Sequence, residues 1–232
     1  MTNNIYQSFL FGENDKVKLE IRYDPLPVHP WCAMDMAGQL DQWSENAGFL
    51  PHEDDVVIGR GNRDAVGFTG PRAVKKWLDK LHKAGKWGVA FGIYCYNDCN
   101  STMRLYENVN WRIADHGDFN GVIYIDSGAF QKWGGDAPND KTDADRIDHA
   151  KRLLRGEFEM LENYVSGACF YGSLLRQCGY CHSWVSENSI GGYYSCDGNN
   201  DDVELARIIL NNFDLTTEER ESFDRKFAGV AV

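Results

Sequence analysis

The chain has 232 residues, of which 35 are Asp or Glu and 24 are Lys or Arg, so its formal net charge is −11. This surplus of carboxylates argues against direct binding to nucleic acid or to an anionic membrane, because both require clustered cations and the sequence has no such cluster. Hydrophobic residues make up 43% of the chain, which is enough for a sizeable core, so we expect a folded protein.

The N-terminal segment MTNNIYQSFLFGENDK has no basic start and no long apolar run, so we expect no signal peptide. No stretch of the sequence approaches the roughly 20 consecutive apolar residues of a membrane helix. The seven cysteines are an odd number in a chain long enough to fold without disulfides, so we interpret them as reduced thiols. Together these features predict a cytoplasmic protein that does not bind membranes.

The first predicted strand covers residues 16–23. In its sequence, KVKLEIRY, apolar and charged residues alternate, and this period of two is typical of a strand with one buried face. The following segment, 24–70, is irregular and punctuated by prolines, with one short helical candidate over 34–43.

An amphipathic helix is predicted to begin at Pro71, because proline at the first helical position loses no hydrogen bond. Gly85 is a typical helix terminator. Between them, apolar residues recur at helical spacing at Val74, Trp77, Leu78 and Leu81.

Three strands are predicted over 89–96, 102–106 and 121–125, because these segments are rich in β-branched and aromatic residues and are separated by turn-forming clusters. They predict a three-stranded part of a sheet. The longest helical pattern covers 143–165, and we expect this helix to cover one face of the sheet.

Two further strands, 169–175 and 184–194, are joined through RQCGYCHS and predict a late β-hairpin. Two short helices follow over 202–212 and 217–227, the second opened by a capping box. Strands that are joined by hairpins and mixed with helices indicate a single α+β domain over residues 1–232. Its sheet is expected to be mixed or antiparallel, with one long covering helix and short C-terminal helices.

Cys178, Cys181 and His182 form the sequence C-G-Y-C-H within the hairpin loop. This is the spacing of c-type haem attachment, but that chemistry normally needs export, which the N-terminal segment does not support. Redox exchange is another alternative, although a thioredoxin-like motif should open a helix and this one joins two strands. Zinc is a third, if further ligands close a tetrahedral site, and the candidates for them are Cys95, Cys99 and Cys196. The simplest interpretation is two reduced cysteines beside a turn, without a cofactor.

Asp115, His116, Asp118 and Asp126 lie near predicted strand ends, where a histidine and carboxylates can act as acid and base. No nucleophile motif accompanies them, because Ser127 lacks the G-x-S-x-G turn. A polar loop before a strand explains these residues equally well. The lack of a complete catalytic signature favours a protein that is not an enzyme.

Carboxylates gather in three stretches of the chain without EF-hand spacing. The ordinary interpretation is solvated loops and helix N-termini. The alternative is an acidic surface that binds a basic partner, including by imitating the phosphate array of DNA. Tryptophans in polar segments would add anchors to such a surface. The predicted binding residues are Glu53, Asp54, Asp55, Asp136, Asp140, Asp143, Asp197, Asp201, Asp202, Trp31, Trp43 and Trp133.

A proline-bearing segment ends in Trp31, Asp35 and Gly38, and the segments IYCYNDCNSTM and GVIYIDSG follow it. Further along the chain come RLLRGEFEMLENYVSGACFYG and a hairpin that ends in GGYY. Together these segments resemble a family of uncharacterised proteins encoded by bacteriophages and related mobile elements. The resemblance spans much of the chain, implies a role in phage biology and supplies no catalytic residues.

We therefore expect an accessory protein of phage type that binds a host or anti-phage defence protein through an acidic surface, and so inhibits or modulates it. If a phage encodes the chain, its expected location is the cytoplasm of the host cell. Two alternatives come from other classes. One is a small-molecule hydrolase that uses His116 and the nearby carboxylates, and the other is a zinc-stabilised binding module.

Overall fold

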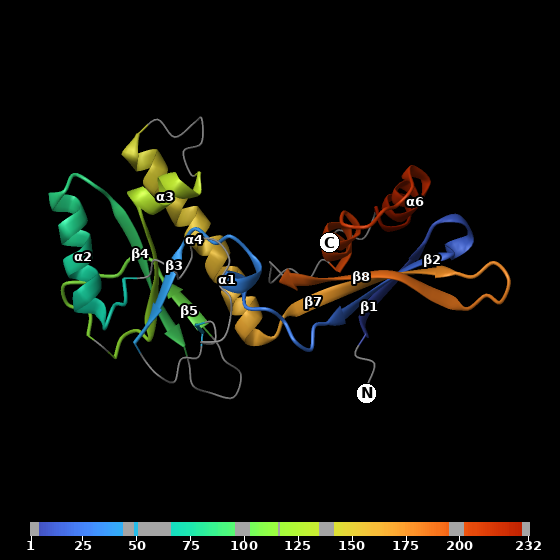
Figure 1. Ribbon diagram of the computed structural model, residues 1–232, viewed down its shortest axis with the longest axis horizontal. Coiled ribbons are helices and arrows are strands. Elements are labelled where there is room, and N and C mark those ends of the chain that lie inside the picture. Colours follow the sequence, from blue (N-terminus) through green and yellow to red (C-terminus); the bar gives the residue numbers. More distant parts are fainter. Residues whose placement is uncertain are drawn as a thin grey trace. The chain divides into compact units, whose positions relative to one another are not determined.

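The computed structural model describes residues 5–43, 49–50, 66–95, 103–115, 117–134, 142–194 and 202–228. Within these residues, helices and two antiparallel four-stranded sheets form an α+β fold (Figure 1). Contacts divide the chain into two compact units, where the sequence predicted one domain. Unit 1 comprises Met1–Pro27 and Gly167–Val232, and unit 2 comprises Val28–Ser166. No helix in the described part of the chain is long and apolar enough to span a membrane.

Unit 1 is built on a sheet with the strand order β1–β2–β7–β8, in which all neighbours are antiparallel. The predicted first strand and the late hairpin are confirmed. The strand β1 was not predicted, and a short 3-10 helix, η1 (Glu13–Asp15), joins it to β2. The strands are β1 (Ile5–Phe11), β2 (Val17–Tyr23), β7 (Cys169–Gln177) and β8 (Trp184–Tyr194).

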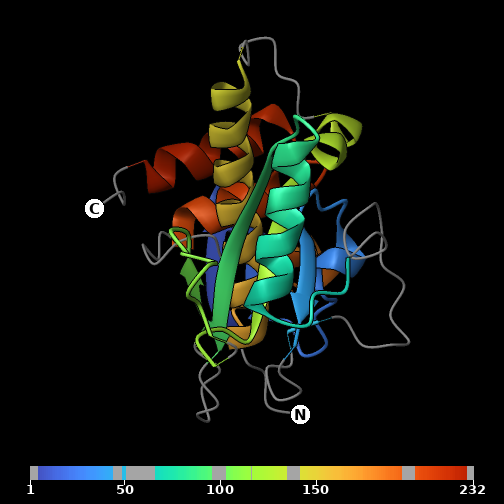
Figure 2. The ribbon, with the colours of Figure 1, turned by 90° about the vertical axis from the view of Figure 1, so that its left-hand side faces the viewer.

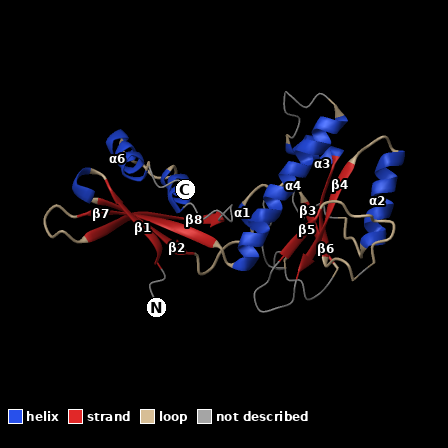
Figure 3. Ribbon diagram, turned by 180° about the vertical axis from the view of Figure 1, so that it is seen from behind, coloured by secondary structure: helices blue, strands red, loops and turns tan. Residues whose placement is uncertain are grey.

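Two helices, α5 (Asp202–Leu210) and α6 (Thr217–Phe227), cover one face of this sheet. Figure 3 shows α6 beside the strands. The buried side chains of β2, such as Leu19, pack with these helices in one apolar core. The predicted capping box is confirmed, because the Thr216 hydroxyl accepts from the Glu219 N–H (3.2 Å) and the Glu219 carboxylate accepts from the Thr216 N–H (2.9 Å).

Unit 2 is built on a second sheet, with the strand order β3–β6–β4–β5. Three of its strands were predicted. The fourth, β3, lies where we expected a helix over 34–43, and that prediction is wrong. The segment forms a strand because it pairs with β6 and buries Leu40 opposite Ile123. The strands are β3 (Gln39–Gln42), β4 (Gly88–Cys95), β5 (Met103–Tyr106) and β6 (Gly121–Asp126).

Helices lie on both faces of the unit 2 sheet, as Figures 1 and 2 show. On one face lies α2 (Pro71–Lys83), and on the other lies the long α4 (Asp143–Ser166) with α3 (Ser127–Trp133). A one-turn helix, α1 (Pro30–Ala33), precedes β3. The two predicted helices over 71–85 and 143–165 are confirmed as α2 and α4, and the longer one covers the sheet as expected. Alternate residues of β4 serve the two faces, which explains why this strand is almost continuously buried.

Candidate functional site

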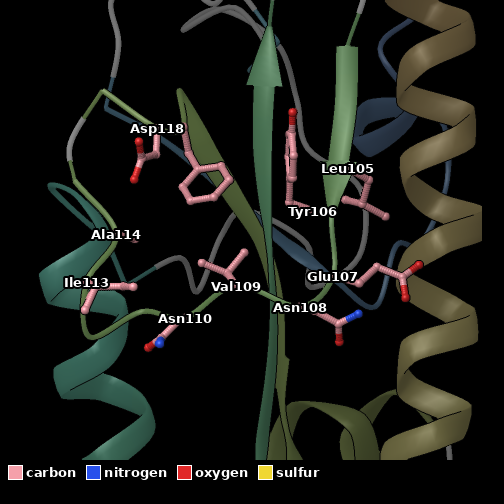
Figure 4. A pocket seen from close by; sticks show the side chains of 10 residues that line it. Leu105, Tyr106, Glu107, Asn108, Val109, Asn110, Ile113, Ala114 and Asp118 are labelled. Atoms are coloured by element: carbon pink, nitrogen blue, oxygen red, sulfur yellow. The ribbon is translucent and has the colours of Figure 1, made fainter.

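A groove of about 810 Å³ lies beside β5, the edge strand of unit 2 (Figure 4). The end of β5 and the segment that leads into β6 form its walls. Its volume falls in the range of sites that bind small ligands or side chains of a partner. We call it the β5 groove, and it is lined by Leu105, Tyr106, Glu107, Asn108, Val109, Asn110, Ile113, Ala114, Asp118 and Phe119.

Aromatic rings form the floor of the β5 groove because a glycine lies beneath them. Gly92 of β4 pairs with Tyr106 of β5, and a Cβ atom at Gly92 would lie 2.6 Å from Cδ1 of Phe119. The Phe119 ring therefore packs directly on the strand. It meets the ring of Tyr106 at a centroid distance of 5.4 Å and that of the buried Trp111 at 5.7 Å.

The glutamate at the groove is already engaged in an ion pair. Glu107 points toward α4 in Figure 4, and its Oε2 accepts from Nη2 of Arg155 at 2.6 Å. The second carboxylate oxygen contacts Nε of the same arginine, so the pair is bidentate. Arg155 accordingly lowers the pKa of Glu107. This side chain holds the groove wall against α4.

Two further polar side chains fold the segment between β5 and β6. Oδ2 of Asp118 accepts from the N–H of Asp115 at 2.8 Å, and Oδ1 of Asn110 accepts from the N–H of Arg112 at 3.3 Å. Such bonds from a side chain to the nearby backbone are typical of turns. The carboxylate of Asp118 nevertheless lines the groove, and the apolar Ile113 is 78% exposed there.

A second hollow, of about 310 Å³, continues from the β5 groove. It lies at the beginning of α2, shares Ala114 with the groove and is also lined by Gly70, Arg72 and Asp115. The two hollows therefore adjoin each other at Ala114.

The structure does not bring two of the predicted catalytic carboxylates together. Asp118 precedes β6, whereas Asp126 ends it, so the length of the strand separates them. Oδ1 of Asp126 accepts from the N–H of Ala129 at 2.8 Å and caps the N-terminus of α3. His116 lies outside the described residues.

A buried glutamate holds the chain where it enters β3. Glu157 of α4 is 5% exposed, and its two carboxylate oxygens accept from the N–H groups of Ala37 (2.6 Å) and Gly38 (2.8 Å). Burial raises the pKa of Glu157 to about 7, the nearby Asp35 adds to this effect, and the two hydrogen bonds oppose it. These contacts give the carboxylate a structural role.

A second buried polar network fixes the segment before α2. Oδ2 of Asp41 accepts from the N–H groups of Gly67 and Phe68, each at 3.1 Å, and the hydroxyl of Tyr124 bonds to the same carboxylate. The N–H of Val66 donates to the Tyr124 hydroxyl at 2.6 Å. Burial raises the pKa of both Asp41 and Tyr124. Perturbed pKa values can mark catalytic sites, but here each perturbed group bonds to backbone that it holds in place.

The predicted tryptophan anchors fix backbone segments with their indole N–H groups. Trp31 is completely buried, so the prediction that it is an exposed anchor is wrong. Its Nε1 and that of Trp133 donate to carbonyls within residues 35–38 at 2.9 and 3.0 Å. Nε1 of Trp43 donates to the carbonyl of Phe119, 2.7 Å away, beside the β5 groove. The bonds of Trp43 and Trp133 join distant parts of the chain, so the neighbouring residues in the sequence did not reveal them.

Two of the predicted acidic binding residues lie at helix starts in the structure. Asp143, at the first position of α4, pairs with Arg146 at 3.2 Å. Asp202, at the first position of α5, accepts from the hydroxyl of Tyr6 at 2.7 Å, and this bond raises the pKa of Tyr6 to about 12. The other acidic candidates lie outside the described residues, namely Glu53, Asp54, Asp55, Asp136, Asp140, Asp197 and Asp201.

The cysteines proposed as zinc ligands belong to both units. Cys178 and Cys181 lie in the loop of the β7–β8 hairpin of unit 1, and Cys95 is buried in unit 2. Cys99 and Cys196 lie outside the described residues. Within the described residues, no three His, Cys, Asp or Glu side chains are grouped so that they could hold a metal ion. Zinc binding stays a prediction.

No protein-family model, curated protein or solved structure matches the chain. The functional interpretation therefore depends on its own geometry. The sequence analysis did not identify the β5 groove, although one signal was present. Gly92 interrupts a strand of large residues, and such a glycine often marks a close approach of another group, here the ring of Phe119.

Proposed function

We propose that the protein is a binding protein and that its β5 groove takes up a short basic segment of a partner protein. The observation that carries this proposal is that the aromatic floor of the groove lies beside the carboxylate of Asp118. The other polar side chains of the groove largely serve to fold its walls. Such a surface offers apolar contact and negative charge. Among the described residues that line it, we find no nucleophile paired with a base, which an enzyme of the hydrolase type would need.

A basic segment suits this groove for three reasons. The faces of Tyr106 and Phe119 attract cations through the ring quadrupole. Asp118 adds a negative charge, and the lining contains no Lys or Arg. The net charge of −11 attracts a cationic partner over longer distances and raises its association rate. An arginine or lysine side chain is therefore the expected anchor.

The resemblance to phage-encoded proteins favours a host or anti-phage defence protein as the partner. Occupying a basic segment of such a protein would inhibit or modulate it, most directly where that segment normally contacts nucleic acid. The proposal extends to the carboxylates outside the groove. Together with the groove they would form a wider acidic surface that imitates the phosphate array of DNA.

Binding of short peptides tests the proposal. An array of peptides of varied charge is screened with the purified protein, and the best binder is titrated by fluorescence anisotropy at increasing salt. We expect the selected peptides to be rich in Arg and Lys and to bind more weakly as salt rises. Asp118→Asn keeps an oxygen acceptor for the loop but removes the charge, and it should weaken binding by up to about fivefold.

Tyr106→Ala should weaken binding by about tenfold or more, because it removes half of the aromatic floor. Val185→Ser serves as the matched control, since Val185 is an exposed apolar residue on β8 of unit 1. It should leave the affinity unchanged. Selection of neutral or acidic peptides, or equal affinities of all three variants and the wild type, would contradict the proposal.

A further inference from the structure

A short closed loop at the tip of the β7–β8 hairpin holds two cysteines next to each other. The N–H of Cys178 donates to the carbonyl of Ser183 at 2.8 Å, and the N–H of His182 donates to the carbonyl of Cys178 at 3.0 Å. His182 has a φ of 58°, in the left-handed region, and this conformation helps to turn the chain immediately after Cys181. The backbone thus sets the positions of both thiols.

The sulfur of Cys181 receives several hydrogen bonds within this loop. Its Sγ lies 2.8 Å from Oγ of Ser183, and the Ser183 N–H and the Cys178 thiol also donate to it. These bonds, of which that from the Ser183 hydroxyl contributes most, lower the pKa of Cys181 to about 7. Hydrogen bonds of this kind favour the thiolate, which is the nucleophilic form of the cysteine side chain.

The other cysteines that the structure describes have the opposite environment. Cys32, Cys95 and Cys169 are buried, and burial raises the pKa of Cys95 and raises that of Cys169 to about 12. Cys181 is exposed and Cys178 is half-buried. A thiol of low pKa that is accessible and lies beside a second thiol is the typical arrangement of a redox-active pair.

We propose that Cys178 and Cys181 perform thiol–disulfide exchange, with Cys181 as the attacking and Cys178 as the resolving cysteine. The Cys181 thiolate attacks one sulfur of a disulfide such as oxidised glutathione. The S–S bond of the oxidant breaks, its other sulfur leaves as a thiolate and takes up a proton, and a mixed disulfide remains on Cys181.

The resolving step then closes the protein disulfide. Cys178 loses its proton and attacks Sγ of Cys181, so the mixed disulfide breaks and a second thiol is released. In total the protein dithiol loses two electrons and two protons, and the oxidant becomes two thiols. The site lies in unit 1 and does not depend on the proposed binding function of the β5 groove. It differs from a thioredoxin-like motif because loop hydrogen bonds, and not a helix N-terminus, stabilise the thiolate.

Mass spectrometry of the full chain tests this exchange. Reduced protein is incubated with oxidised glutathione, free thiols are alkylated, and the peptides are mapped. We expect the Cys178–Cys181 peptide to lose two hydrogen atoms, while the buried Cys169 stays reduced and is alkylated only after unfolding. The Cys178→Ser variant should accumulate one glutathionyl group on Cys181, because the resolving thiol is missing.

The Ser183→Ala variant tests the origin of the reactivity. A return of the pKa from about 7 to the ordinary 9.0 would reduce the thiolate at neutral pH about 50-fold, but a thiolate of higher pKa is more nucleophilic. The initial rate should therefore fall by about five- to eightfold. Absence of the disulfide, trapping of glutathione on Cys178 instead of Cys181, or a pair that is unreactive until a bound metal is chelated would overturn the proposal.

Discussion

The ring of Phe119 packs on Gly92 so closely that a Cβ atom at position 92 would lie 2.6 Å from Cδ1 of the ring. Glycine within a strand is unfavourable in itself, since it loses much conformational freedom on folding and offers no side chain for packing. At this position it allows an aromatic ring to pack directly against the strand. The floor of the β5 groove therefore depends on a residue that does not line it.

Replacing Gly92 by alanine should displace the Phe119 ring and deform the β5 groove. We expect the free energy of unfolding to fall by about 1–3 kcal/mol, as is usual when an extra methyl group is forced into a packed region. Binding of the selected basic peptide should weaken in parallel. Urea denaturation followed by tryptophan fluorescence measures the stability, and the buried Trp111 beside Phe119 should report the displacement.

Gly156→Ala is the matched control for this variant. Gly156 lies inside α4, and a Cβ atom there would meet nothing within 4 Å. Alanine should stabilise the helix by up to about 1 kcal/mol and leave peptide binding unchanged. If both alanine variants lost the same stability, close packing at Gly92 would not be the cause.

The buried carboxylate of Glu157 should make stability depend on pH. Its pKa in the folded protein is raised from 4.5 to about 7, so the folded state holds the proton more tightly than the unfolded chain does. Below about pH 4.5 the bound proton stabilises the folded state by its full amount, about 3 kcal/mol. This stabilisation is lost as the pH rises through about 7.

The Glu157→Gln variant isolates this contribution, because an amide does not titrate in this range. The free energy of unfolding of the wild type minus that of the variant should decrease between about pH 4.5 and 7. Urea denaturation at several pH values measures this difference. A difference that stays constant over the window would mean that Glu157 is already ionised throughout it.

Asp126 should act as a helix cap and not as an acid or base. Asp126→Ala removes the acceptor for the N–H of Ala129 and should cost about 1 kcal/mol, whereas Asp126→Asn keeps an acceptor and should cost much less. Thermal or urea unfolding distinguishes the two variants. Equal losses in both would show that the charge of Asp126, and not its hydrogen bond to Ala129, stabilises the helix start.

Tyr124→Phe should destabilise unit 2 by about 1–3 kcal/mol. The variant removes the hydroxyl that accepts from the N–H of Val66 and bonds to Asp41, so this N–H and the buried Asp41 carboxylate each lose a partner. Hydrogen exchange should accelerate at the Val66 amide. Tyr6→Phe in unit 1 is the comparison, because it removes only one bond to Asp202 and should cost less. A reversed order of the two losses would contradict the role assigned to the Tyr124 network.

Elements with a clear local period could be predicted from the sequence, and those that depend on pairing could not. The alternation in 16–23 and the long helical stripe of 143–165 predicted β2 and α4 almost to their ends. The strand β1 lacks such alternation, and β3 has four residues whose conformation is set by pairing with β6. Tertiary contacts decide such segments.

The candidate sites divide in the same way, into one that a local sequence pattern predicted and one that depends on tertiary contacts. The C-x2-C spacing pointed to Cys178 and Cys181 because both cysteines lie on one turn. The β5 groove depends on the contact of Phe119 with Gly92, residues far apart in the sequence that a local pattern cannot connect. Trp31 illustrates the converse, since its short, proline-bearing segment suggested exposure but its neighbours in space are apolar and bury it completely.

Chemical-shift mapping tests the central claim most directly. Amide resonances of the isotope-labelled full chain are followed while the selected arginine-containing peptide is added. The account predicts that the largest shifts occur at the residues that line the β5 groove, namely Leu105 to Asn110, Ile113, Ala114, Asp118 and Phe119. Shifts that concentrate in unit 1, with the groove residues unchanged at saturation, would contradict it.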